Sequence, residues 1–83
     1  MIKEKVKVTL RSGLQARAAS MFVQEANRFR STVFLEKNNK KVNAKSIMGL
    51  MSLAVGPNSE IVIEVNGPDE EKAMTHLKDF ITN

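Results

Sequence analysis

Residues 31–65 read STVFLEKNNKKVNAKSIMGLMSLAVGPNSEIVIEV, a stretch in which a hairpin, a helix and a strand are predicted in turn. Asn38 and Asn39 tolerate positive φ and suit a two-residue turn between strands over residues 31–36 and 40–43. Ser46 has the side chain of an N-cap for a helix over residues 47–53, and one face of that helix carries Ile47, Leu50 and Met51. After a Gly-Pro-Asn-Ser turn at residues 56–59, apolar side chains alternate in a strand over residues 61–65.

The flanking residues predict one more strand and two longer helices. Apolar and polar side chains alternate over residues 5–11, as in a strand with one buried face. Apolar positions spaced by three and four predict a helix over residues 16–29, and a second such stripe predicts a helix from near Pro68 to Ile81 with acids in its first turn. The stripes comprise Ala19, Phe22, Val23 and Ala26, then Ala73, Met74, Leu77, Phe80 and Ile81.

The predicted order β-α-β-β-α-β-α fits one domain over residues 1–83. Neither a sheet nor separate helices can bury their apolar faces alone. We therefore expect an α+β fold, an open-faced two-layer sandwich with a four-stranded antiparallel sheet and three helices on one face.

Composition excludes several classes of protein. The chain is 42% hydrophobic and 27% charged, as in globular domains, and with no cysteine and one histidine it predicts no disulfide, no metal site and no cofactor. The longest uncharged stretch, residues 46–59, is shorter than the roughly 20 apolar residues of a membrane span. The N-terminus lacks the pattern of a secretory signal, so the expected location is cytoplasmic.

Charge is unevenly distributed along the chain. Residues 1–45 carry eleven basic and three acidic side chains, a net charge of +8, whereas residues 46–83 carry two and six, a net charge of −4. The basic half predicts an anionic partner, either an acidic protein surface or a phosphate added to the protein itself. A small basic nucleic-acid-binding domain is less favoured, because the chain has no Trp or Tyr and its four Phe fall in apolar patterns.

Ser46 and the residues around it are the main candidates for a site. The helix cap alone explains a serine at this position. The hydroxyl also suits phosphorylation, because a helix follows it, Lys45 precedes it, and Lys40 and Lys41 are close in the sequence. Met48 lies off the apolar stripe and is either plain surface or a contact residue. If the helices over 16–29 and 47–53 lie side by side, Met21, Met48 and Ile47 form an exposed apolar patch.

Two further side chains could take part in chemistry. Arg17 is unfavourable in the first turn of a helix, which points to anion recognition. His76 could accept a phosphoryl group, but within a helix the backbone N–H groups beside it are already bonded, which favours a solvated or packing role.

Two motifs together resemble the HPr family, the histidine-containing phosphocarriers of the bacterial sugar phosphotransferase system. They are Gly-Leu-Gln-Ala-Arg at residues 13–17 and Lys-Ser-Ile-Met-Gly-Leu-Met-Ser-Leu at residues 45–53, and the resemblance covers essentially the whole chain. It departs at Gln15, where phosphocarriers have the accepting histidine. A carboxamide has no lone pair basic enough to attack phosphorus, so the resemblance implies a member without phosphocarrier chemistry.

Gln15 and residues 22–29 are most similar to the regulatory HPr-like members that act in carbon catabolite repression. The resemblance implies a protein that is not an enzyme and that is phosphorylated on Ser46 from ATP by HPr kinase/phosphorylase. The phosphoprotein then binds the catabolite control repressor, a LacI-type transcription regulator, as its corepressor, without direct contact with nucleic acid or a membrane. The partner-binding residues would be Gln15, Arg17, Met21, Lys45, Ile47, Met48 and Met51.

The resemblance also concerns flexibility and assembly. Ala18 stands where the family usually has proline, which implies a slightly looser helix start within the same fold. The related members exchange their first strand between subunits, so a strand-swapped homodimer with a hinge at residues 11–13 is an alternative to the monomer.

The alternative function is that of a phosphotransferase-system phosphocarrier that acts through His76.

Overall fold

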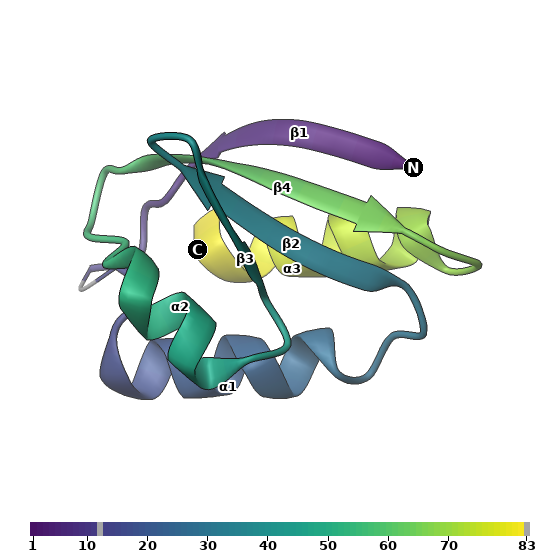
Figure 1. Cartoon of the computed structure of the whole chain (residues 1–83), viewed down its shortest axis with the longest axis horizontal. Helices are drawn as coiled ribbons and strands as arrows, with labels where there is room; N and C mark the ends of the chain where they lie inside the picture. Colours follow the sequence, from purple (N-terminus) through teal and green to yellow (C-terminus); the bar gives the residue numbers. More distant parts are fainter. Residues whose placement is uncertain (12, 83) are drawn as a thin grey trace.

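The computed structural model describes residues 1–11 and 13–82 and contains the four strands and three helices in the predicted order (Figure 1). The predicted hinge at residues 11–13 includes Ser12, which lies outside the described residues. The elements are β1 (Ile2–Lys7), α1 (Ala16–Ala26), β2 (Thr32–Lys37), β3 (Lys40–Asn43), α2 (Ile47–Leu53), β4 (Glu60–Asn66) and α3 (Glu70–Thr82).

The strands form one antiparallel sheet in the order β1-β4-β2-β3. All three helices lie on one side of this sheet, with α2 beside α1 (Figure 1). Asn38 and Asn39 have φ of 51° and 66°, as the two-residue hairpin turn requires. The expected open-faced two-layer sandwich is therefore confirmed.

The core lies between the sheet and the helices. Alternate residues of β4 (Ile61, Ile63 and Val65) are buried, as the period of a strand with one covered face requires. From the helix layer, Phe22 is fully buried and meets Phe80 edge-on, with ring centroids 5.8 Å apart. These contacts hold α1 and α3 against each other beneath the sheet.

Phe34 differs from the expectation that every phenylalanine lies in an apolar pattern. It alternates with the buried Val33 and Leu35 on β2, so its half-buried side chain lies on the open face of the sheet. The ammonium group of Lys41 lies 5.1 Å from the centroid of its ring.

Two predicted elements have wrong bounds. The first strand, predicted over residues 5–11, runs over Ile2–Lys7, because the backbone of Val8 turns to exchange hydrogen bonds with the loop at residues 58–59. The helix predicted over residues 16–29 ends at Ala26, since the N–H groups of Arg28 and Phe29 bond to carbonyls only three residues back and close the last turn. The strand over residues 40–43 and the helix over residues 47–53 have the predicted bounds, and the boundaries of the remaining elements differ by one or two residues.

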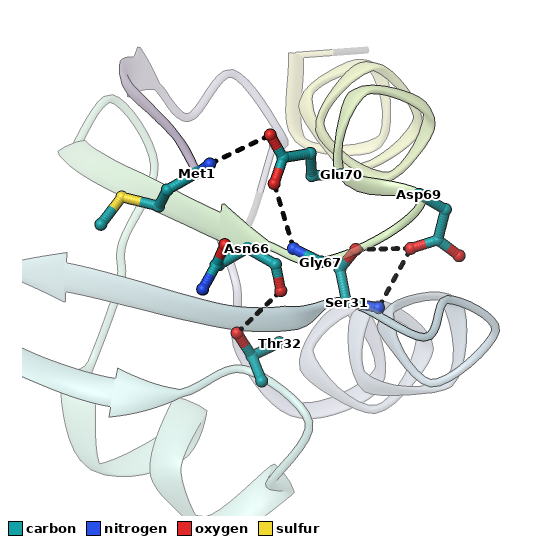
Figure 2. Close-up of polar contacts among 7 residues, drawn as sticks. All are labelled: Met1, Ser31, Thr32, Asn66, Gly67, Asp69 and Glu70. Atoms are coloured by element: carbon teal, nitrogen blue, oxygen red, sulfur yellow. Dashed lines mark hydrogen bonds and ion pairs between the residues drawn. The ribbon is translucent and has the colours of Figure 1, made fainter.

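A cluster of polar contacts fastens the start of β2 to the start of α3 (Figure 2). The carboxylate of Asp69 accepts hydrogen bonds from the backbone N–H groups of Arg30 and Ser31 and from the Ser31 hydroxyl. Glu70 accepts from the Gly67 N–H at 3.0 Å and forms an ion pair with the terminal amine of Met1 at 3.1 Å. Bonds of this kind stabilise the ionised carboxylate, and those from Ser31 and Arg30 lower the pKa of Asp69 from 3.8 to about 2.

We expect this lowered pKa to make Asp69 a source of acid sensitivity. The folded state favours the ionised form, so the stabilisation is complete above pH 3.8 and is lost as the pH falls toward about 2. Urea unfolding of wild type and Asp69→Asn should therefore show a lower midpoint for the variant at pH 6 and a gap that closes as the pH is lowered. A gap of constant size from pH 6 to pH 2 would contradict the assignment.

Among the helices of residues 1–11 and 13–82, none is both long enough and apolar enough to cross a bilayer.

Candidate functional site

Ser46 is the N-cap of α2 and is half-buried. Its backbone is extended, at φ −114° and ψ 118°, and its hydroxyl oxygen accepts a hydrogen bond of 3.2 Å from the N–H of Gly49, as predicted for an N-cap. The turn before it is closed by Asn43, whose side-chain oxygen accepts from the N–H of Lys45 at 2.8 Å. A Cβ added at Gly49 would lie 3.1 Å from the carbonyl oxygen of Asn43, so glycine allows α2 to start close to the end of β3.

The apolar residues of α2 that are predicted to form part of a partner-binding surface are exposed. Leu50 and Leu53 are the buried residues of the helix, whereas the side chains of Ile47, Met48 and Met51 are 40%, 79% and 53% exposed. Of the predicted apolar face of Ile47, Leu50 and Met51, only Leu50 is buried. Leu50 and Leu53 pack this short helix against the rest of the protein, and the positions beside them therefore stay exposed to solvent.

Gln15 precedes α1 with an extended backbone and an exposed side chain that makes no capping hydrogen bond. Its carbonyl accepts from the N–H of Ala18 at 3.1 Å, in the first turn of α1. Gln15 shares one hollow with Arg17 and Met21 and a second hollow with Met51. The structure thus brings together predicted site residues from α1 and α2 around Gln15.

The lysines near Ser46 in the sequence are bonded elsewhere. Lys45 donates to the carbonyl of Phe29 at 2.8 Å, beyond the end of α1. Lys40 donates to the carbonyl of Ser52, close to the other end of α2, and Lys41 forms an ion pair with Glu64 of β4 at 2.7 Å. Lys40 and Lys41, which are close to Ser46 in the sequence, thus make their contacts away from its hydroxyl, because successive residues of β3 point to opposite faces of the sheet.

His76 lies on α3, and its Nε2 forms a hydrogen bond of 2.5 Å with the carboxylate of Glu25 of α1. Its ring also packs against Phe29, with centroids 5.5 Å apart. The hydrogen bond from His76, with a smaller contribution from Arg28, lowers the pKa of Glu25. These contacts give the histidine a packing role between two helices, as the sequence favoured. In residues 1–11 and 13–82, His, Asp and Glu side chains form no group of three that could hold a metal ion.

Sequence reasoning missed two residues that lie beside Arg17. Arg11 follows β1 and Phe80 belongs to α3, yet both line the hollow that contains Gln15. Only the tertiary fold brings these segments together, and no local pattern marks them.

Comparison with known proteins gives a consistent family assignment. The family model described as "PTS HPr component phosphorylation site" matches residues 2–83. The HPr-like protein Crh of Bacillus subtilis is 58% identical over 81 residues, which cover 98% of this chain and 95% of that protein.

Two solved structures resemble this one. The phosphocarrier protein HPr from Bacillus anthracis superimposes with a TM-score of 0.96 at 52% identity, covering 98% of this chain and 96% of the other. The crystal structure of Crh from Bacillus subtilis, described as a dimer with a swapping domain, has a TM-score of 0.78 at 58% identity and covers 98% and 93%.

Proposed function

The chain belongs to the HPr family, and we propose that it is a regulatory member that acts after phosphorylation of Ser46. HPr kinase/phosphorylase would transfer the terminal phosphoryl group of ATP to Ser46. The phosphoprotein would then bind the catabolite control repressor as a corepressor. The observation that carries this proposal is the Ser46 hydroxyl at the start of a helix whose outer surface is apolar and uncharged.

The proposed phosphorylation transfers one phosphoryl group from ATP to the Ser46 hydroxyl. The Ser46 oxygen forms the new bond to phosphorus, the bond between the terminal phosphoryl group and ADP breaks, and the hydroxyl proton passes to a base of the kinase. The product carries a charge of about −1.5 to −2. Because α2 contains no charged residue, this change converts an apolar surface into one with a strong acceptor for an arginine-bearing partner.

Gln15 supports a regulator rather than a phosphocarrier. Its neutral amide stands in the position of the accepting histidine and cannot form a phosphoryl-imidazole. His76 does not replace the accepting histidine. It lies within α3, and its Nε2 is hydrogen-bonded to Glu25 of α1.

The partner-binding surface that we propose extends over α2 and the start of α1. Exposed apolar side chains on both helices can pack against a partner while the charged groups at the edges orient it. Its residues are Gln15, Arg17, Met21, Lys45, Ile47, Met48 and Met51.

We expect Ser46→Ala to abolish phosphorylation by the kinase and any gain in repressor affinity. Phosphorylated wild type should bind the repressor about 10- to 100-fold more tightly than unmodified protein, as expected for one or two charge-assisted hydrogen bonds. Mass spectrometry reports the phosphate, and calorimetric titration with the repressor reports the affinity.

Ser52→Ala is the matched control for that experiment. Ser52 is another serine of α2, and its hydroxyl donates to the carbonyl of Gly49 at 2.8 Å. The control should be phosphorylated and should bind the repressor like wild type. Phosphate on Ser46→Ala, or equal repressor affinity with and without the phosphate, would refute the proposed function.

We also propose that the chain can form a homodimer by exchange of β1. The swapping dimer of the 58% identical Crh supports this assembly. So does the position of β1, which pairs with β4 alone and is an edge strand.

A further inference from the structure

Asn66 is the last residue of β4, and it is the only asparagine of the chain that is followed by a glycine. Because Gly67 has no side chain, nothing of its own shields its backbone nitrogen from the neighbouring carboxamide. Asn66 is exposed, and in Figure 2 only its backbone carbonyl is bonded, to the hydroxyl of Thr32 at 3.1 Å. Within residues 1–11 and 13–82 no hydrogen bond holds its carboxamide, which can therefore rotate toward the backbone.

The reaction open to this pair of residues is the loss of ammonia from Asn66. The backbone nitrogen of Gly67 gives up its proton and forms a bond to the Cγ atom of the carboxamide. The bond from Cγ to the side-chain nitrogen breaks, and that nitrogen leaves with the proton as ammonia. Water then opens the resulting succinimide ring at either of its carbonyl groups. The product is aspartate or isoaspartate, with a new negative charge, and water is the only other reactant.

The folded protein restrains the nitrogen that would attack. The N–H of Gly67 donates to Oε1 of Glu70 at 3.0 Å, and Oε2 of the same carboxylate is paired with the terminal amine of Met1 at 3.1 Å. The bond from Gly67 is the largest cause of the lowered pKa of Glu70, so this carboxylate is a weak base toward the Gly67 proton. Ser31 confines the segment further, because a Cβ built on Gly67 would lie 2.5 Å from the Ser31 Cα.

We propose that Asn66 is a site of deamidation and that Glu70 protects it in the folded protein. The hydrogen bond to Glu70 keeps the Gly67 nitrogen and its proton in place, and the reaction proceeds from molecules in which this contact has opened. The site lies between β4 and α3, whereas Ser46 lies at the start of α2. The modification requires neither a kinase nor a partner protein, so it goes beyond the function proposed above and does not depend on it.

The modified chain should be less stable than the original one. Isoaspartate carries the main chain through its side-chain carbon and so lengthens the backbone just before Gly67. The close contact of Gly67 with Ser31 leaves no room for this change. We therefore expect the isoaspartate form to unfold at a lower urea concentration than the unmodified protein.

The test is incubation of the full chain at neutral pH, followed by peptide mapping with mass spectrometry and an assay for isoaspartate. The capped peptide Glu-Val-Asn-Gly-Pro-Asp, which has the sequence of residues 64–69, gives the rate without the fold. Wild type should deamidate at Asn66 about 10-fold or more slowly than this peptide. Glu70→Ala should react about 2- to 10-fold faster than wild type, as expected for the loss of one hydrogen bond.

Three further variants separate protection by Glu70 from a general loosening of the fold. Glu71→Ala removes an exposed carboxylate from the same turn of α3 and should react like wild type. Glu70→Gln keeps an oxygen that can accept from Gly67 and should retain most of the protection. Asp69→Asn weakens the contacts with Ser31 but leaves Glu70 in place, so it should react more slowly than Glu70→Ala.

Several results would overturn the proposal. Equal rates for folded wild type and the peptide would show that the fold gives no protection. Equal rates for Glu70→Ala and Glu71→Ala would show that the bond from Gly67 has no part in it. A slower reaction of Glu70→Ala would make Glu70 a base for the reaction and would contradict its protecting role. Loss of ammonia from other asparagines in place of Asn66 would contradict the assignment of the site.

Discussion

Replacement of Phe22 by alanine is expected to lower the free energy of unfolding by about 3–5 kcal/mol. The side chain is fully buried on α1 and meets Phe80 edge-on, so truncation removes a large apolar contact and leaves a cavity between α1 and α3. A domain of 83 residues has a total stability of roughly 4–12 kcal/mol, so the variant should be close to unfolded at the lower end of that range. Urea unfolding followed by circular dichroism measures the loss.

Phe34→Ala is the matched control, because it makes the same chemical change on the open face of the sheet. Phe34 is half-buried and its ring contacts the ammonium group of Lys41, so its truncation opens no cavity in the core. We expect it to cost clearly less than Phe22→Ala. Equal losses of unfolding free energy for the two variants would show that the buried contact of Phe22 contributes no more to stability than a side chain on the open face of the sheet.

Replacement of Gly67 by alanine is expected to destabilise the protein by at least about 2 kcal/mol. The backbone of Gly67 has φ +155°, and a Cβ built there would lie 2.5 Å from both the Cα and the hydroxyl oxygen of Ser31. Backbone atoms cannot yield cheaply, so Ser31 must move away from Asp69 and the contacts in Figure 2 must break. The urea midpoint at neutral pH measures this change.

Gly56→Ala is the control for a glycine replaced in open surroundings. The atom nearest to an added Cβ there is the Ser59 hydroxyl oxygen at 3.9 Å. Its stability should stay unchanged or rise by up to about 1 kcal/mol, because alanine restricts the unfolded chain. If both glycine variants unfold at the same urea concentration, the close approach of Gly67 to Ser31 does not constrain the stability of the protein.

Much of the fold could be predicted because local patterns report burial directly. The alternation in β4 and the paired asparagines before β3 predict a strand and a turn without knowledge of the rest of the chain. The errors lie where a distant segment decides the backbone. Val8 leaves the sheet to bond with residues 58–59, and the turn after Ala26 is set by the connection to β2.

The candidate site follows the same division. The cap at Ser46 is a local feature, and its geometry was predicted, whereas its phosphorylation stays a prediction. The outward position of Met51 could not be read from helical spacing, because the depth at which a short helix packs depends on its neighbours. The directions of Lys40 and Lys45 likewise depend on which carbonyl groups lie within their reach.

The amino-acid sequence alone determined the order of strands and helices, the cap of α2 and the membership of the chain in its family, because each depends on residues that are neighbours in the chain. Only the tertiary structure decided that Gln15 lies near Met51 and that Arg11 shares a hollow with Arg17 and Phe80. The physical reason is that packing of the helices against one face of the sheet brings distant segments into contact, and side-chain patterns record burial but not the identity of the neighbour.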